Sequence, residues 1–248
     1  MTQYDEVSAK FLALADELLP GRVRGLYLTG SIPLDDFRPG RSDIDGVVVV
    51  DTPVTEDEVR PLHANLPSRP YFDVTYLTAA ELAVAPDPGA PLVCTVDGEF
   101  KVGGASPVLW AELARSSLAV REVPGLTVVD DHQALVDYTR DNLVSYWQPL
   151  LDQVDKHFAD LPRDQVIDAW IIPWCVLGVP RLHALLATGN IVSKTAAGEH
   201  GAVTFPAYGE LCRRAIEHRG GAEVVFTAAD AVEAVAFGRA VVASAAGL

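Results

Sequence analysis

Two aspartates, Asp43 and Asp45, stand directly before a run of four valines in the segment SDIDGVVVV (42–50). A strand that enters a protein core normally carries no charge, because burying an unpaired carboxylate is costly. The two aspartates are two positions apart, so on a strand their side chains point to the same face and repel each other. The pattern therefore predicts a buried strand whose charges are compensated by a cation.

A hard divalent cation such as Mg²⁺ supplies this compensation, because it binds carboxylate and phosphate oxygens. We expect a third acid from a neighbouring strand, and Asp73 is the only acid in the apolar segment YFDVTYL (71–77). Asp73 is also suited to act as a general base toward an attacking hydroxyl. The alternative is that these acids cap turns, as Ser-Asp before an apolar run often does. Asp45 and Asp73 argue against it, since each lies inside an apolar strand.

A phosphate site is predicted next to the acids. The segment GLYLTGS (25–31) has the pattern of a strand that ends at Gly30. Backbone N–H groups and the Ser31 hydroxyl can hold a phosphate there, and a glycine lets the phosphate chain approach the backbone. Ser42 adds a hydroxyl beside the aspartates. With the three acids, these residues predict a site for a nucleoside triphosphate and two metal ions.

The pattern of elements changes near residue 130. Before it, strand-like segments alternate with helical ones, and the Asp-Gly pair in VCTVDGEFKV (93–102) predicts a tight hairpin. From Asp131 onward the apolar residues follow a helical period, and we expect no strands there. We therefore predict an α+β protein with two domains. Residues 1–130 form an α/β domain with a mixed sheet, and residues 131–248 form an all-helical bundle.

Composition excludes several classes of protein. The formal net charge is −15, from 34 acidic and 19 basic side chains, so the surface repels nucleic acid and attracts cationic small molecules. The same acidity could instead serve solubility alone. The three cysteines and six histidines show neither a disulfide framework nor zinc-ligand spacing. We find no signal-peptide pattern, and the apolar stretch 169–180 is too short to span a bilayer. We expect a cytoplasmic protein with no membrane partner, and its oligomeric state stays open.

These motifs resemble the nucleotidyltransferase superfamily that includes DNA polymerase β, whose signature is Gly-Ser, a spacer and Asp-x-Asp. In this chain the signature reads GS at 30–31 and SDID at 42–45, and FDVTYL supplies the third carboxylate. Within the superfamily, the chain is most similar to the aminoglycoside adenylyltransferases of the streptomycin/spectinomycin type. The similarity lies in FRPGRSDID (37–45), in Arg181 and in TGNIVSKTAAG (188–198).

The resemblance implies a Mg²⁺-dependent transfer of AMP from ATP to a hydroxyl of a small, cationic acceptor such as an aminoglycoside, which would confer antibiotic resistance. The reaction would take place in a cleft between the two domains. The implied metal ligands are Asp43, Asp45 and Asp73, of which Asp73 is a ligand or the general base. The implied phosphate ligands are Gly30, Ser31 and Ser42. From the helical domain, Lys194 would reach the triphosphate and Arg181 would line the same cleft.

Two aromatic residues are expected on the acceptor side. Phe100 and Trp174 offer flat surfaces to a sugar ring or a protonated amine. Asp97 and Glu99, on the same hairpin as Phe100, are expected to pair with ammonium groups of the acceptor. The alternative is that both aromatic residues belong to the core. In the family, a tryptophan stands at the position of Phe100, and some members have an acid at that of Trp174.

The other departures from the family concern the acids and the cations. The family's third acid is usually glutamate, which reaches further than Asp73, and the spacer here contains LDDF instead of a glycine pair. Lys194 follows Ser193, so it could also be a solvated residue at the start of a helix. Arg181 follows a proline in an apolar helix and faces either the cleft or a buried acid.

Two other functions stay open. The acceptor could be a protein, as for the small nucleotidyltransferases that are paired with toxins, although those are commonly minimal domains without a large helical half. Alternatively, the chain could be a catalytically silent, nucleotide-binding regulatory protein. The presence of all three acids argues against this second alternative.

Overall fold

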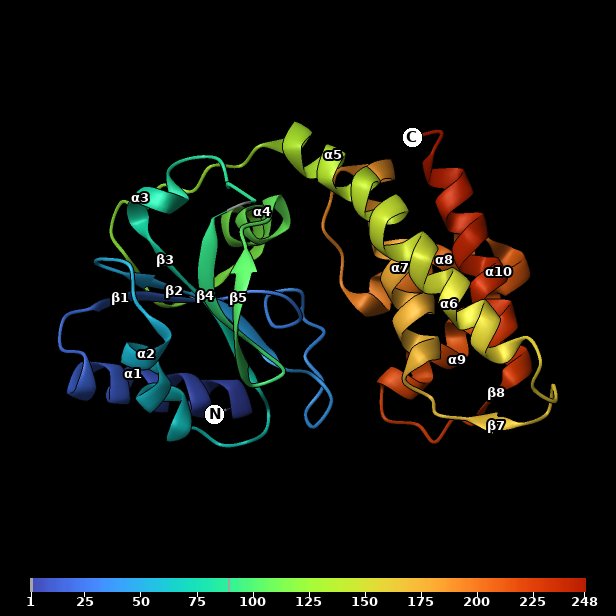
Figure 1. Cartoon of the computed structure of the whole chain (residues 1–248), viewed down its shortest axis with the longest axis horizontal. Helices are drawn as coiled ribbons and strands as arrows, with labels where there is room; N and C mark the ends of the chain where they lie inside the picture. Colours follow the sequence, from blue (N-terminus) through green and yellow to red (C-terminus); the bar gives the residue numbers. More distant parts are fainter. Residues whose placement is uncertain (1, 89) are drawn as a thin grey trace. The chain divides into compact units, whose positions relative to one another are not determined.

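The computed structural model describes residues 2–88 and 90–248, and the chain divides into two compact units, residues 1–135 and 136–248 (Figure 1). The first unit is built on one sheet with the strand order β5-β4-β3-β2-β1-β6. Its elements are α1 (Gln3–Leu18), β1 (Val23–Leu28), β2 (Ile44–Val50), α2 (Glu56–Ala64), β3 (Phe72–Thr78), α3 (Ala79–Leu82), β4 (Pro91–Val96), β5 (Glu99–Gly104), α4 (Pro107–Ser116) and β6 (Leu118–Arg121).

The sheet is mixed, as predicted. Strands β2 and β3 are parallel, and the other neighbouring strands are antiparallel. Apolar side chains cover both faces of the central strands. Ile44, Val48 and Val50 of β2 point into a core with α1 and α2, whereas Val47 and Val49 point into a second core on the other face. This two-sided burial explains the continuous run of valines.

The alternation of side chains also places the acids. On β3, Phe72 and Val74 point into the core with α1 and α2, so the intervening Asp73 points to the opposite face. On β2, Asp45 shares its face with Val47 and Val49, and Asp45 is the register partner of Asp73. Two carboxylates therefore lie side by side on one face, at the start of both strands.

The second unit is a bundle around α7. Its elements are α5 (His132–Asn142, which begins before the division between the units), the π-helical segment η1 (Leu143–Trp147), α6 (Gln148–Phe158), β7 (Val166–Ile167), α7 (Ile171–Thr188), α8 (Lys194–Thr204), the 3₁₀ turn η2 (Pro206–Tyr208), α9 (Gly209–Arg219), β8 (Phe226–Thr227) and α10 (Ala228–Ala245). Glycines bring the helices close together. A Cβ at Gly198 would lie 2.6 Å from Leu177, and one at Gly238 would lie 2.6 Å from Leu151.

Two features of this unit differ from the expectations. The strands β7 and β8 pair antiparallel in the half for which no strand was expected. Each has two residues, which is too short for an alternating pattern to be recognised. The apolar stretch at 169–180 continues into a helix that ends at Thr188. This helix, α7, is long and apolar enough to cross a membrane by length and composition, and 61% of the window is buried inside the protein, as in a core helix.

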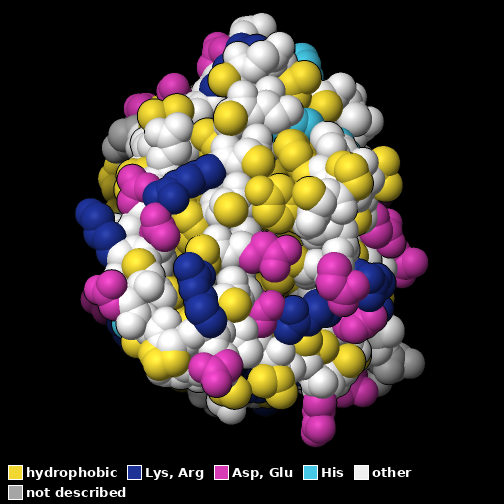
Figure 2. All heavy atoms as spheres, turned by 90° about the vertical axis from the view of Figure 1, so that its right-hand side faces the viewer, with side chains coloured by type: hydrophobic (Ala, Val, Ile, Leu, Met, Phe, Trp, Pro, Cys, Tyr) yellow, Lys and Arg dark blue, Asp and Glu magenta, His cyan; other side chains and the backbone are white. Residues whose placement is uncertain are grey.

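Charged side chains of both signs are spread over the face of the protein that Figure 2 shows. Figure 2 shows one face of the protein, on which acidic and basic side chains are interspersed with apolar ones. The net charge of −15 is therefore not gathered into a single acidic patch on that face.

Candidate functional site

Three carboxylates converge at one end of the sheet. Asp43 directly precedes β2, Asp73 is the second residue of β3, and Asp97 lies in the turn between β4 and β5. Each offers one oxygen, and these three atoms lie within 4.8 Å of one another. We call this group the three-carboxylate cluster. Oxygen ligands at such spacing suit a hard divalent cation.

The hairpin turn holds Asp73 through both of its carboxylate oxygens. The backbone N–H of Asp97 donates to Oδ2 at 2.8 Å, and that of Gly98 donates to Oδ1 at 3.0 Å. Both turn residues have positive φ, +56° and +75°, as the tight Asp-Gly turn requires. A Cβ at Gly98 would lie 2.7 Å from the ring of Tyr71. The turn is thus packed between Tyr71 and Asp73 and fixes the orientation of the carboxylate.

Asp97 is the acid whose place sequence reasoning missed. It was expected to meet the ammonium groups of an acceptor, and the structure brings it into the three-carboxylate cluster instead. The hairpin pattern contained a usable signal. Because β4 runs antiparallel to β3, its last residues return to the end of the sheet where β3 begins, and Asp97 follows β4 directly.

Asp45 lies next to this cluster but outside the set of three found among the described residues. Its carboxylate is turned toward Gly30, where a Cβ would lie 2.5 Å from Oδ2 of Asp45. Gly30 also has a φ of +62°, which favours glycine. The sequence suggested that a small residue leaves room for a phosphate. In the structure, Asp45 itself occupies the space that a side chain at position 30 would need.

The two serines differ in their bonding. Among the residues that the structure describes, none gives the buried Ser31 hydroxyl a hydrogen-bond partner. An unsatisfied buried hydroxyl is costly, and this one lies directly after Gly30. Ser42 is buried and accepts a hydrogen bond from the backbone N–H of Arg38 at 3.0 Å. Ser31 is therefore the serine whose hydrogen-bonding capacity is unused in the described part of the chain, whereas Ser42 stabilises the loop before β2.

In the second unit, a cavity of about 230 Å³ brings three predicted site residues together. We call it the Trp174 cavity. The Lys194 ammonium lies 5.2 Å from the centre of the Trp174 ring. Trp174 is 40% exposed and donates from Nε1 to the Tyr146 hydroxyl at 3.2 Å. Arg181 also lines the cavity, and its Nε donates to the carbonyl of Val192 at 3.2 Å. Trp174 is thus on the wall of a cavity and not inside the core.

Phe100 has a different environment. Its ring packs beside the core of α1 and α2, which is the sheet face opposite to Asp73. It meets His63 edge-on at 4.9 Å between ring centres, and the Arg60 guanidinium lies 5.1 Å from its centre. In this same core, Nε2 of His63 lies 2.8 Å from the Tyr76 hydroxyl. Burial lowers the pKa of His63 to about 4 and raises that of Tyr76.

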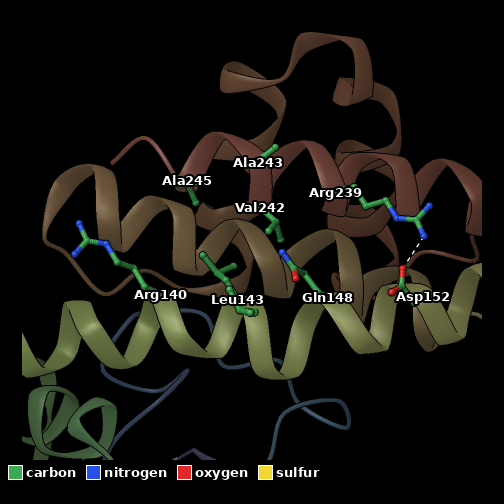
Figure 3. A pocket seen from close by; sticks show the side chains of 10 residues that line it. Arg140, Leu143, Gln148, Asp152, Arg239, Val242, Ala243 and Ala245 are labelled. Carbon is green, nitrogen blue, oxygen red and sulfur yellow. Dashed lines mark hydrogen bonds and ion pairs between the residues drawn. The ribbon is translucent and has the colours of Figure 1, made fainter.

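A larger cavity of about 560 Å³ lies along α10 in the second unit, and none of the predicted site residues lines it (Figure 3). At one end, Arg239 is paired with Asp152 at 2.7 Å and with Asp155 at 2.9 Å. The floor is formed by Leu143, Val242 and small residues of α10. Its chemistry does not match that of a triphosphate site, because acids already pair with both of its arginines, Arg239 and Arg140.

Comparison with known proteins gives one kind of match. A scan against models of known protein families finds no match, and a search of curated proteins finds no relative. Among solved structures, the chain is similar to spectinomycin adenyltransferase from Enterococcus faecialis, which was crystallised with ATP and spectinomycin. The TM-score is 0.72 over 98% of this chain and 100% of that one, at 16% sequence identity. The two proteins share a fold.

This match extends over both units. The predicted fold class and the resemblance to the nucleotidyltransferases are thereby confirmed at the level of the fold. At 16% identity, the two sequences differ at most of their positions.

Proposed function

We propose that the protein is a nucleotidyltransferase that transfers AMP from ATP to a hydroxyl group of a small-molecule acceptor. The observation that supports this most is the three-carboxylate cluster, in which Asp73 is oriented by two backbone N–H groups. It is found in a fold shared with an adenyltransferase that was crystallised with ATP. We expect the reaction to occur in the cytoplasm.

The residues present fit a bound Mg²⁺. The cluster offers three carboxylate oxygens within 4.8 Å, and Asp45 lies beside Asp73 in register on the same face. Asp43, Asp45, Asp73 and Asp97 are therefore the residues that would hold one or two ions. When bound, the metal neutralises charge on the phosphates and on the departing pyrophosphate.

The side chains have separate tasks in this proposal. Each Asp73 oxygen accepts one backbone hydrogen bond and keeps a further lone pair, so Asp73 can take a proton from the acceptor hydroxyl or bind metal without turning. The Ser31 hydroxyl and the backbone at Gly30 bind phosphate oxygens. Such fixed donors act mainly by positioning the reactants for in-line attack.

The Trp174 cavity of the second unit is lined by the other predicted site residues. Lys194 and Arg181 provide positive charge for the triphosphate, and the exposed Trp174 ring provides a flat surface for the acceptor. We propose a cationic aminocyclitol or aminoglycoside as the acceptor. The support for this choice is the net charge of −15 and the spectinomycin in the neighbour's crystal.

Pyrophosphate release tests this function. The purified protein is given ATP and Mg²⁺ with spectinomycin, streptomycin or a neutral sugar, and we expect release only with a cationic acceptor. The assay is repeated at rising salt concentration, because salt screens the attraction between an acidic protein and a cationic acceptor. Release that does not fall as salt rises, or that favours neutral sugars, would contradict the cationic acceptor. ATP binding without any release, measured by calorimetry, would instead indicate a silent nucleotide-binding protein. Covalent labelling of a protein by ATP would indicate the protein-modifying alternative.

A further inference from the structure

An arginine that the proposed function does not use lies at the edge of the three-carboxylate cluster. The guanidinium of Arg69 lies 3.7 Å from the centre of the Tyr71 ring. Its Nη1 lies 3.7 Å from Oδ1 of Asp43. The side chain of Arg69 is 68% exposed. Tyr71 in turn packs on Gly98 of the hairpin turn that holds Asp73. A cation thus lies over the same aromatic ring that supports the site.

The contact with Asp43 is a loose one. Charge-assisted hydrogen bonds between guanidinium and carboxylate groups are about 2.7–2.9 Å long, and this separation is clearly longer. Stacking on Tyr71 therefore contributes much of what holds the guanidinium in place. A planar group that is held by its face keeps its N–H edge available for a planar or tetrahedral oxyanion.

The Asp43 carboxylate cannot pair with Arg69 and bind a metal ion equally well at the same time. A divalent cation bound at Asp43 repels the guanidinium. The triphosphate that accompanies the metal carries more negative charge than one divalent ion neutralises, and it brings that charge to the same place. Arg69 can then exchange a carboxylate partner for a phosphate partner with its guanidinium still over Tyr71.

We infer that Arg69 binds the phosphate oxygens of ATP and of the departing pyrophosphate. This inference rests on the proposed function, because it assumes that the three-carboxylate cluster is the triphosphate site. The opposing interpretation is that Arg69 only reduces the repulsion among the acids. The two differ in what Arg69→Ala does to pyrophosphate affinity, since removing a mere counter-charge would not weaken pyrophosphate binding, whereas removing a phosphate ligand would.

The test is the affinity for pyrophosphate, measured by calorimetry in the presence of Mg²⁺. We expect Arg69→Ala to weaken binding about tenfold or more, as for loss of hydrogen bonds to a charged group, and Arg69→Lys to restore part of it. Arg24→Ala, which removes another exposed arginine of the first unit, is the matched control and should change nothing. Thermal melting of each variant checks that the fold is intact.

Kinetics separate this inference from the proposed function. If the wild type releases pyrophosphate and Arg69→Ala raises KM for ATP while pyrophosphate affinity falls, both stand. Unchanged pyrophosphate affinity in Arg69→Ala, with an active wild type, would overturn the inference alone. If the wild type binds pyrophosphate through Arg69 but no acceptor supports turnover, the proposed transfer fails and the phosphate contact stands. A wild type that binds neither ATP nor pyrophosphate would overturn both.

Discussion

The acid end of the sheet and the Trp174 cavity hold their functional side chains in different ways. At the sheet, Asp73 is fixed by strand register and by two backbone N–H groups of a neighbouring turn. In the cavity, Lys194 and Trp174 come from two helices, α8 and α7, and meet through a ring contact at 5.2 Å. Backbone bonds hold the first arrangement to one geometry, whereas the second depends on how helices pack. We therefore expect sharp losses from small changes at the sheet and graded losses in the cavity.

The largest effect is expected from Asp45→Asn. Asp45 lies in register with Asp73 and against Gly30, so removing its charge should reduce AMP transfer to background while the fold persists. The apo melting temperature should be unchanged or higher, because one of several repelling carboxylates is gone. The exposed acid Asp57 of α2 provides the control variant Asp57→Asn. Near-normal turnover of Asp45→Asn would contradict the metal assignment.

The hairpin turn can be tested without touching an acid. In Gly98→Ala the new Cβ would meet the Tyr71 ring at 2.7 Å, so the turn must shift and loosen its hold on Asp73. We expect the single-turnover rate to fall about 10²-fold, as for lost acid–base help, with a smaller change in ATP affinity.

Gly125→Ala is the matched control for this turn. Gly125 has a φ of +70°, and no heavy atom of the described residues lies within 4 Å of its added Cβ. Both variants therefore suffer similar backbone strain, and only Gly98→Ala should lose rate. Equal losses in the two would show that strain in the unit, and not the orientation of Asp73, limits the reaction.

The pH dependence of the free energy of unfolding distinguishes the buried histidine of the first unit from those of the second. The folded pKa of His63 is about 4, below its ordinary value of 6.5, because of burial. The unfolded chain therefore binds a proton that the folded chain does not, so stability is complete above pH 6.5 and is lost as the pH falls toward 4. We expect a loss of about 2 kcal/mol between pH 7 and pH 5 from this residue, measured by urea unfolding.

The matched variant for this pH effect is His63→Gln, which keeps a polar partner for Tyr76. It should flatten that part of the pH dependence. In the second unit, His183 and His200 also have lowered pKa values, through burial and, for His183, the neighbouring His200. If the pH profile of stability is unchanged in His63→Gln, the loss of stability at low pH comes from the histidines of the second unit or from the carboxylates.

The smallest effect is expected in the Trp174 cavity. Lys194→Met should raise KM for ATP about tenfold, in the range of one charge-assisted contact, with little change in kcat. Trp174→Leu should mainly raise KM for the acceptor, because a cation–π contact contributes about 0.5–2 kcal/mol. Initial rates at varied ATP and varied acceptor distinguish the two. A collapse of kcat in Lys194→Met would mean that this cavity is as strictly organised as the sheet.

Sequence patterns predicted where Asp45 and Asp73 lie on the sheet, because the determinants of their positions are local. The positions of Asp45 and Asp73 follow from alternation along two strands, and the Asp-Gly pair specified the turn between β4 and β5. The proximity of Asp97 to Asp43 did not follow, because it needs the strand order of the sheet. The unsatisfied Ser31 hydroxyl is likewise invisible without its neighbours.

The helical unit was less predictable. A helical period indicates which residues face a core, but not which helices touch. The contact of Lys194 with Trp174 and the pairing of β7 with β8 are both tertiary, as is the packing of Phe100 on His63 in the first unit. The π-helical segment η1 cannot be recognised from the spacing of apolar residues either.

The close approach of helices through glycine has a thermal consequence. Glycine lowers the intrinsic stability of a helix by about 1 kcal/mol per residue, and α8 contains Gly198 and Gly201 within 11 residues. A peptide of α8 alone should therefore be largely unfolded in water, and the helix that begins at Lys194 exists only while α7 and α9 are packed against it. On warming, the helices that line the Trp174 cavity should not unfold before the rest of their unit. They should unfold in the same cooperative step as the whole bundle.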